Sequence, residues 1–350
     1  MKISKKSSYP QIASIVGYLR KIDTLKLSGY ISRGESRKFD TFDSGMFRPG
    51  HEYRTCKPFV TQYYDYICNT LTEVQKKHFL AFSQHHGIPT NLLDFSISPL
   101  VSLFFACQKS RNDVSDNGYV YFINNRRLVN MGEHIAADIN CIKELLSTAE
   151  QSRLITQEFF DKIELVGDAF TGIMESPIRD ATEEYVEVLQ REVFKGESAD
   201  VILCNLRDEY SDRDIGLNFL SKLEQSCRHH YQYDSEFIDF LLVFNRYVNA
   251  LPSLCPDKRK EFTLPFYLTY NPPSISQRID NQSSVFVQQQ FIIGDKAPVL
   301  CIQKIIPDEI FEITNKSKIL EELDCLGINA KYIYNDYDSI AQYVKGKVIP

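Results

Sequence analysis

The sequence predicts an α+β fold, with small mixed or antiparallel sheets, flanking helices and an inserted, mostly helical block. β-rich patterns occur on both sides of the middle of the chain, at residues 118–123 and 284–293 for example. Helical spacing of apolar residues accompanies both regions. Residues 125–260 differ from the rest of the chain in composition, because they are charged and mostly helical in pattern. We therefore expect this block to be a helical insertion or lid.

Three elements are expected in the first part of the chain. Apolar residues recur at helical spacing in residues 11–21, which predicts a short helix. Residues 29–34 have the pattern of a short strand that ends in a turn. Residues 59–82 are expected to be helical, with Tyr63 and Ile67 among the residues of one face.

A buried helix is expected to begin at residue 98. Ser98 is of a type favoured at the N-cap, and Pro99 suits the first helical position because it has no amide hydrogen to leave unpaired. The residues that follow, to about 109, are apolar on all sides, which is typical of deep burial. The order predicted here is a helix and then the strand at 118–123.

The remaining elements follow from the same two periodicities. Three helices are expected inside the block, at residues 138–148, 156–166 and 237–251. Three β-rich runs are expected after it, at residues 262–270, 284–293 and 298–306. An amphipathic helix at 316–326 should be closed by Gly327, and a last short helix should begin near Asp336.

The composition narrows the class of protein. The net charge of −6 argues against a chain that coats nucleic acid by charge alone, although local basic patches stay open. Nine cysteines without any Cys-x-x-Cys pair favour reduced thiols in a cytoplasmic protein over a disulfide framework or a zinc ribbon. The N-terminus has no apolar run of the secretory kind, and no stretch of 18 apolar residues predicts a membrane span.

Polar groups are concentrated at residues 84–90. Glycine and proline should hold this stretch in a fixed turn. His85 or His86 could serve as a proton shuttle near neutral pH, and the alternative is a loop histidine with an ordinary hydrogen bond. No third ligand is suitably spaced, so no metal site is expected here. The spacing in Cys227-Arg-His229-His230 fits no common metal site either.

Two further places could contact an anionic or sugar ligand. Arg33 could grip a phosphate or carboxylate with two N–H groups, and Gly34 would permit a close approach of the backbone. The alternative is a structural arginine paired with a nearby carboxylate. If residues 94–98 are extended, Asp94, Ser96 and Ser98 share one face and suit a ribose or an amide. The alternative is that Asp94 and Ser98 merely cap the following helix.

A later segment, residues 278–286, precedes a predicted strand. Arg278 could be a second anion clamp and Gln282 a neutral hydrogen-bonding fork. The alternative is the entrance to a β-hairpin. Neither a P-loop nor a Rossmann glycine fingerprint occurs in the sequence.

The stretch from Gln84 to Leu100 resembles the FRG domain, a family encoded by bacteria and phages. The family is named for an aromatic-Arg-Gly motif, which corresponds here to Ser32-Arg33-Gly34. Two later segments, 278–286 and 323–338, resemble further signatures of the family. The resemblance implies a first part of the domain at 10–124 and a second part at 261–347, separated by the helical block at 125–260. Ser32 takes the place of the aromatic residue of the motif, with Tyr30 nearby. Three further residues depart from the family pattern: Asn91 replaces Arg, Phe95 replaces Trp and Ser284 replaces Gly.

The layout is similar to that of the arginine–serine–glutamate class of ADP-ribosyltransferases. By this analogy Arg33 would bind the pyrophosphate of NAD, and Ser96 or Ser98 would hold the nicotinamide ribose. Gln282 stands where that class has a glutamate, so the charge would come from Asp94, Asp280 or a different mechanism. The catalytic candidates are Arg33, His85, Asp94 and Gln282. The candidates for binding NAD are Arg33, Gly34, Gln84, Thr90, Ser96, Ser98 and Arg278.

The resemblance implies an NAD-dependent ADP-ribosyltransferase-like effector or NAD glycohydrolase, toxic to the host and used in phage defence. The main alternative is a non-catalytic module that senses a nucleotide or a phage protein. A nuclease or other hydrolase is a third option, which lacks an obvious metal cluster. The expected partners are a nucleotide and a phage or host protein, with nucleic acid left open. The protein is expected to be cytoplasmic, with no membrane contact and no metal.

Overall fold

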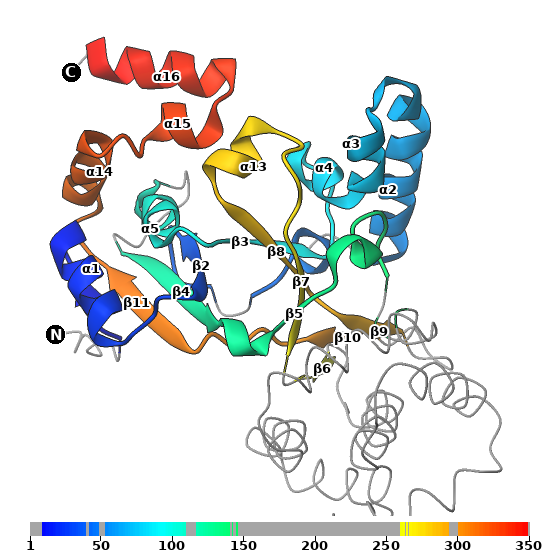
Figure 1. Cartoon of the computed structure of the whole chain (residues 1–350), viewed down its shortest axis with the longest axis horizontal. Coiled ribbons are helices and arrows are strands. Elements are labelled where there is room, and N and C mark those ends of the chain that lie inside the picture. Colours follow the sequence, from blue (N-terminus) through cyan, green and yellow to red (C-terminus); the bar gives the residue numbers. More distant parts are fainter. Residues whose placement is uncertain are drawn as a thin grey trace, which may run out of the picture.

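The computed structural model confirms the α+β class (Figure 1). It describes residues 9–39, 42–48, 53–109, 117–140, 142, 145, 260–262, 264, 266–293 and 300–348. The helices predicted at 156–166 and 237–251, and most of the one predicted at 138–148, lie outside the described residues.

The larger sheet has eight strands, in the order β1-β11-β4-β2-β3-β8-β7-β5. The pairs β1–β11 and β5–β7 are parallel, and the other neighbours are antiparallel. The bounds are β1 Gln11–Ile12, β11 Glu309–Ile313, β4 Gly118–Asn124, β2 Tyr30–Glu35, β3 Leu92–Ser96, β8 Ser284–Gln288, β7 Tyr267–Tyr270 and β5 Leu128–Asn130. Strands from both ends of the chain therefore build one sheet.

A smaller sheet has three strands, in the order β6-β10-β9. The strand bounds are β6 Lys260–Phe262, β10 Leu300–Gln303 and β9 Phe291–Ile293. The three β-rich runs predicted after the block thus correspond to five strands, since two of the runs are each divided in two.

Helices cover the larger sheet in two groups (Figure 1). At the β11–β4 end lie α1 (Ile15–Thr24), α5 (Pro99–Cys107) and α14 (Lys316–Cys325). At the β8–β7 end lie α2 (Tyr53–Ile67), α3 (Glu73–Lys77) and α4 (Phe79–His85). The other helices among the described residues are α13 Gln277–Asn281, α15 Ala330–Tyr334 and α16 Tyr337–Val348, with short 3₁₀ turns at Gly45–Phe47, Cys68–Thr70, Asn125–Arg127 and Gly132–Ile135.

Helix α5 lies unusually close to the sheet. A Cβ atom added to Gly34 in β2 would come within 1.7 Å of the carbonyl oxygen of Ser102 in α5. A Cβ atom added to Gly118 in β4 would come within 1.9 Å of the carbonyl oxygen of Ala106. Glycine at both positions lets the helix backbone rest directly on two strands. The sequence predicts that Gly34 permits a close approach of the backbone to a ligand. In the structure, Gly34 permits the close approach of α5 to β2.

Several expected boundaries are confirmed. Pro99 is the first residue of α5, and Gly327 has a φ of +83° directly after the α14 cap. The carboxylate of Asp336 accepts a hydrogen bond from the backbone N–H of Ser339 at 2.7 Å, as an N-cap should. Ser98 is a partial exception: it occupies the N-cap position, but its side chain makes no capping hydrogen bond.

Other expectations need correction. The helix predicted at 11–21 begins later, at Ile15, because the Ser14 side chain caps it and residues 11–12 form β1. The single helix predicted at 59–82 is divided into α2, α3 and α4. The turn at Cys68–Thr70 and the cap at Thr72 separate α2 from α3, and His78 separates α3 from α4. Helices α13 and α15 were not expected, since five residues are too few to show a helical period.

No helix in the described part of the chain is long and apolar enough to cross a membrane. Among the same residues, no group of three or more histidine, cysteine or acidic side chains could hold a metal ion. The thiols of Cys56, Cys68, Cys107 and Cys325 are free.

Candidate functional site

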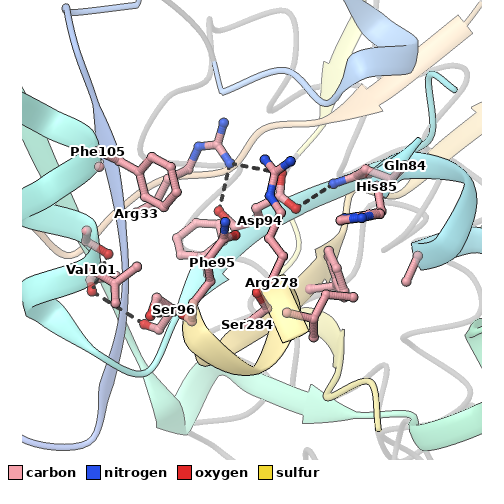
Figure 2. Close-up of a pocket in the computed structure, with 17 residues that line it drawn as sticks. Arg33, Gln84, His85, Asp94, Phe95, Ser96, Val101, Phe105, Arg278 and Ser284 are labelled. Carbon is pink, nitrogen blue, oxygen red and sulfur yellow. Dashed lines mark hydrogen bonds and ion pairs between the residues drawn. The ribbon is translucent and has the colours of Figure 1, made fainter. Parts of the chain in front are cut away.

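The larger sheet is split between β2 and β3. These strands pair at one position, Ser32 with Ser96, whereas β2 pairs with β4 over six residues and β3 with β8 over five. A cavity of about 210 Å³ opens beside the split, between the two strands, α4, α5 and α13 (Figure 2). Eight of the predicted site residues line it: Arg33, Gly34, Gln84, His85, Asp94, Ser96, Arg278 and Gln282.

Arg33 bridges the split. Its Nη1 donates to the backbone oxygen of Asp94 at 2.7 Å, and its Nε donates to the Glu35 carboxylate at 2.9 Å. The Asp94 carboxylate lies 4.0 Å from Nη1. Burial by itself lowers the pKa of Arg33, but Glu35 and Asp94 act in the opposite direction and leave it raised. The structural arginine considered from the sequence is therefore present, with Glu35 as its main partner.

Asp94 is held in place by α4. Gln84 Nε2 donates to Asp94 Oδ1 at 2.8 Å, and the Thr90 hydroxyl donates to Gln84 Oε1. Thr90 also accepts the backbone N–H of Leu92 at 3.2 Å. Thr90 is buried and does not line the cavity, so it fixes the Gln84 amide and leaves ligand contact to that amide. The Asp94 side chain is 58% exposed, which leaves its charge accessible from the cavity mouth.

The side chains of Ser96 and Gln282 already form hydrogen bonds with the backbone. The Ser96 hydroxyl donates to the backbone oxygen of Gln282 at 2.6 Å and accepts the N–H of Ser98 at 2.9 Å. Gln282 Nε2 donates to the backbone oxygen of Ile333 at 3.2 Å. A ligand hydroxyl at Ser96 would therefore have to be the donor. Ser98 does not line the cavity, so its predicted contact with a ribose has no geometric support.

Arg278 reaches the cavity from α13. Among the described residues it forms no ion pair within 4.0 Å. Its guanidinium carbon lies 5.2 Å from the ring centroid of Tyr334. Figure 2 shows the side chains of Arg33 and Arg278 extending toward the Asp94 end of the cavity. Two cations and one accessible carboxylate thus meet at this end.

His85 lies at the last turn of α4 and lines the cavity. Burial, followed by the positive charge of Arg278, lowers the pKa of His85 from its ordinary value of about 6.5. Burial also lowers the pKa of His86. A neutral imidazole can accept a proton, which is the state that a general base requires.

We expect an NMR titration of the imidazole protons to give a pKa below about 6.5 for His85. Since the folded-state pKa is lowered, the stability that depends on His85 is present above about 6.5 and is lost as the pH falls toward the folded value. Arg278→Ala should raise the pKa of His85 and leave that of His86 unchanged, because burial alone accounts for the latter. An unchanged pKa of His85 in the Arg278→Ala variant would contradict this account.

Sequence reasoning overlooked several residues of the site. Ser32 and Ser102 line the cavity, and their hydroxyl oxygens lie 2.8 Å apart. Phe105 contributes an aromatic wall from α5. Glu35 could have been found, because residues i and i+2 of a strand share a face and Arg33 was already a candidate. Ser102 and Phe105 gave no such signal, since they belong to a mostly apolar helix whose pattern predicts burial in the core.

The departures from the expected family pattern divide into two kinds. Phe95 and Ser284 line the cavity. Asn91 is fully buried, and its Nδ2 donates to the backbone oxygen of Gln289 at 3.4 Å. Asn91 therefore contributes to the fold beside β8 and does not contact the cavity.

A protein-family model matches the part of the chain that supplies several residues of this cavity. The family model described as FRG domain matches residues 24–115. The chain carries an FRG domain. The matched residues include Arg33, Gln84, His85, Asp94 and Ser96, whereas Arg278 and Gln282 come from beyond the match. No curated protein and no solved structure matches the chain. The likeness of this FRG domain to ADP-ribosyltransferases therefore stays a proposal.

Proposed function

We propose that the FRG domain binds NAD in the cavity beside the β2–β3 split and acts on it as an ADP-ribosyltransferase or NAD glycohydrolase. The observation that supports this proposal is the presence in one cavity of an accessible carboxylate, Asp94, and of an arginine, Arg278, that forms no ion pair within 4.0 Å among the described residues. NAD has a positively charged nicotinamide ring and negatively charged phosphates. Asp94 would attract the ring, and Arg278 would attract the phosphates.

The size of the cavity limits what it can enclose. Pockets for drug-sized ligands usually span about 300–1,000 Å³, and this one measures about 210 Å³. It would enclose only part of a dinucleotide. We place the nicotinamide and its ribose inside, next to Asp94 and Phe105, with the phosphates at the mouth beside Arg278.

The reaction would break the bond between nicotinamide and C1′ of the ribose. Positive charge develops on the ribose as neutral nicotinamide leaves, and a carboxylate nearby stabilises that charge. Asp94 is the accessible carboxylate, because Gln282 is neutral and its amide is bound to Ile333. Water or an acceptor hydroxyl would then form the new bond to C1′ and pass its proton to neutral His85.

A nucleotide-sensing module is the second candidate. The hydrogen bonds of Ser96 and Gln282 favour it. Both side chains already donate to backbone oxygens, so fewer of the predicted site residues are available to take part in a reaction. A role as a toxic effector in phage defence rests on the family resemblance and belongs to the proposal in either form.

Asp94→Asn tests the proposal directly. Asparagine keeps an oxygen for Gln84 Nε2 and removes the charge, so nicotinamide release should fall by about 100-fold or more. The preference for NAD over NADH in calorimetric titrations should also shrink, because only NAD has the charged ring. Asp65→Asn, an exposed change of the same charge on α2, should alter neither quantity.

The outcomes separate the candidates. Saturable NAD binding without nicotinamide release by the unmodified protein would support the sensing module and exclude the enzyme. Release that is unaffected by Asp94→Asn would remove Asp94 from the mechanism. Absence of both binding and release would show that NAD is not the ligand.

A further inference from the structure

Helix α13 brings Arg278, Ile279 and Gln282 to the cavity, although it is only five residues long. A helix of this length is not stable on its own, because nucleation costs more than so few hydrogen bonds return. Its position must therefore come from its neighbours.

The neighbour that holds α13 is α15. Asn281 Nδ2 donates to the backbone oxygen of Tyr332 at 2.6 Å, and Gln282 Nε2 donates to that of Ile333 at 3.2 Å. At the other end of α13, Asn335 Nδ2 donates to Gln277 Oε1. Side-chain hydrogen bonds thus fasten both ends of α13 to the segment 332–335.

Tyr334 lies at the centre of this contact. Its ring faces the Arg278 guanidinium at 5.2 Å, and it meets the rings of Phe104 and Phe105 edge-on, with centroids 6.2 Å and 6.1 Å away. Phe105 also lines the cavity. Burial raises the pKa of Tyr334, so the hydroxyl stays protonated and the ring neutral. A single ring therefore packs against the cationic group of the mouth and against one wall of the cavity.

We propose that Tyr334 is a positioning residue that holds the Arg278 guanidinium ready for the phosphate of the ligand. A ring face restrains an arginine without using its N–H groups, because the attraction acts through the face of the guanidinium. A carboxylate partner would occupy those donors and compete with the ligand. Holding the side chain in advance also removes the entropy cost of ordering a long, flexible arginine on binding.

The proposal rests on the proposed function and extends the site beyond the residues that match the family. Arg278 and Tyr334 both lie outside residues 24–115. Anion recognition would therefore come from the C-terminal part of the chain, while the matched part supplies Asp94 and His85.

The test compares Tyr334→Leu with Tyr334→Phe in calorimetric titrations with NAD and with nicotinamide riboside, which has no phosphate. Tyr334→Leu removes the ring and should weaken NAD binding about tenfold. It should change nicotinamide riboside binding by less than about twofold, because that ligand does not use Arg278. Tyr334→Phe keeps the ring and should retain NAD binding. Circular dichroism melting confirms that both variants are folded.

A double-mutant cycle makes the result decisive. In an Arg278→Ala background, Tyr334→Leu should cause no further loss of NAD binding. Equal losses for the two ligands, or additive losses with Arg278→Ala, would overturn the proposal, since a purely structural role moves both ligands alike.

A separate experiment distinguishes failure of the proposed function from failure of the role of Tyr334. If the unmodified protein does not bind NAD, the proposed function is wrong, and the same variants are titrated with inorganic pyrophosphate as the anion. A tenfold loss for Tyr334→Leu with that probe would support the role of Tyr334 in anion binding. No pyrophosphate binding, or equal binding by the variants, would overturn it.

Discussion

Gly34→Ala is expected to destabilise the FRG domain severely, by about 3 kcal/mol or more. The new methyl group would lie 1.7 Å from the Ser102 carbonyl oxygen, 2.7 Å from its carbon and 2.8 Å from the Ala106 nitrogen. All three are backbone atoms of α5, so no side chain can turn aside to make room. The helix would have to move off β2, and its buried residues Leu103 and Phe104 would lose their packing. Urea unfolding followed by circular dichroism measures the loss, since the chain has no tryptophan to report by fluorescence.

Gly346→Ala is the matched control. Gly346 lies in α16, where an added Cβ atom meets nothing within 4 Å, so alanine should leave the stability unchanged or raise it by up to about 1 kcal/mol. Gly118→Ala should resemble Gly34→Ala, because its Cβ atom would lie 1.9 Å from the Ala106 carbonyl oxygen. Near-native stability of Gly34→Ala would show that α5 does not rest on β2 as described.

The second large effect is expected at Arg33. Its side chain and that of Glu35 are 14% and 10% exposed, so removing the guanidinium leaves a nearly buried carboxylate without its partner. We expect Arg33→Ala to lower the free energy of unfolding by about 3 kcal/mol. The variant also loses the 2.7 Å hydrogen bond that joins β2 to the backbone of Asp94 across the split. The midpoint of urea unfolding measures the change.

Glu35→Gln in the Arg33→Ala background should recover part of this loss, because it removes the stranded charge and keeps nearly the same volume. The recovery should be larger than any gain that Glu35→Gln gives alone. A double variant no more stable than Arg33→Ala would contradict the role given to Glu35. Loss of NAD binding in Arg33→Ala is informative only at temperatures where that variant is folded, so the double variant is the better protein for the binding assay.

Local patterns were enough for much of the fold. The strand at 29–34, the Pro99 start of α5, the strand at 118–123 and the Gly327 end of α14 all depend on residues close in sequence. The pairing of β3 with β8 is different, because its partners lie nearly 200 residues apart and no local signal records it. The family resemblance brought those two segments together where periodicity could not.

The candidate site shows the same division. Gln84, His85 and Asp94 come from one stretch of sequence and meet as expected. The sequence could not show that Ser98 lies outside the cavity or that Thr90 acts through Gln84, since both depend on where β3 ends and α5 begins. It also could not show that Gln282 is tied to Ile333, because α13 and α15 were too short to be seen.

The single pairing between β2 and β3 divides the larger sheet into two blocks of four strands, β1-β11-β4-β2 and β3-β8-β7-β5. A sheet with a continuous ladder fixes the spacing of its strands at about 4.8 Å, and side chains cannot alter it. At this seam the strands pair only at Ser32 and Ser96, and side chains such as Arg33 supply the other contacts, so a substitution that widens the aperture can cost at most that one pairing. Phe95 and Ser284 border the same aperture. Substitutions at the seam could therefore adapt the same fold to ligands of different width.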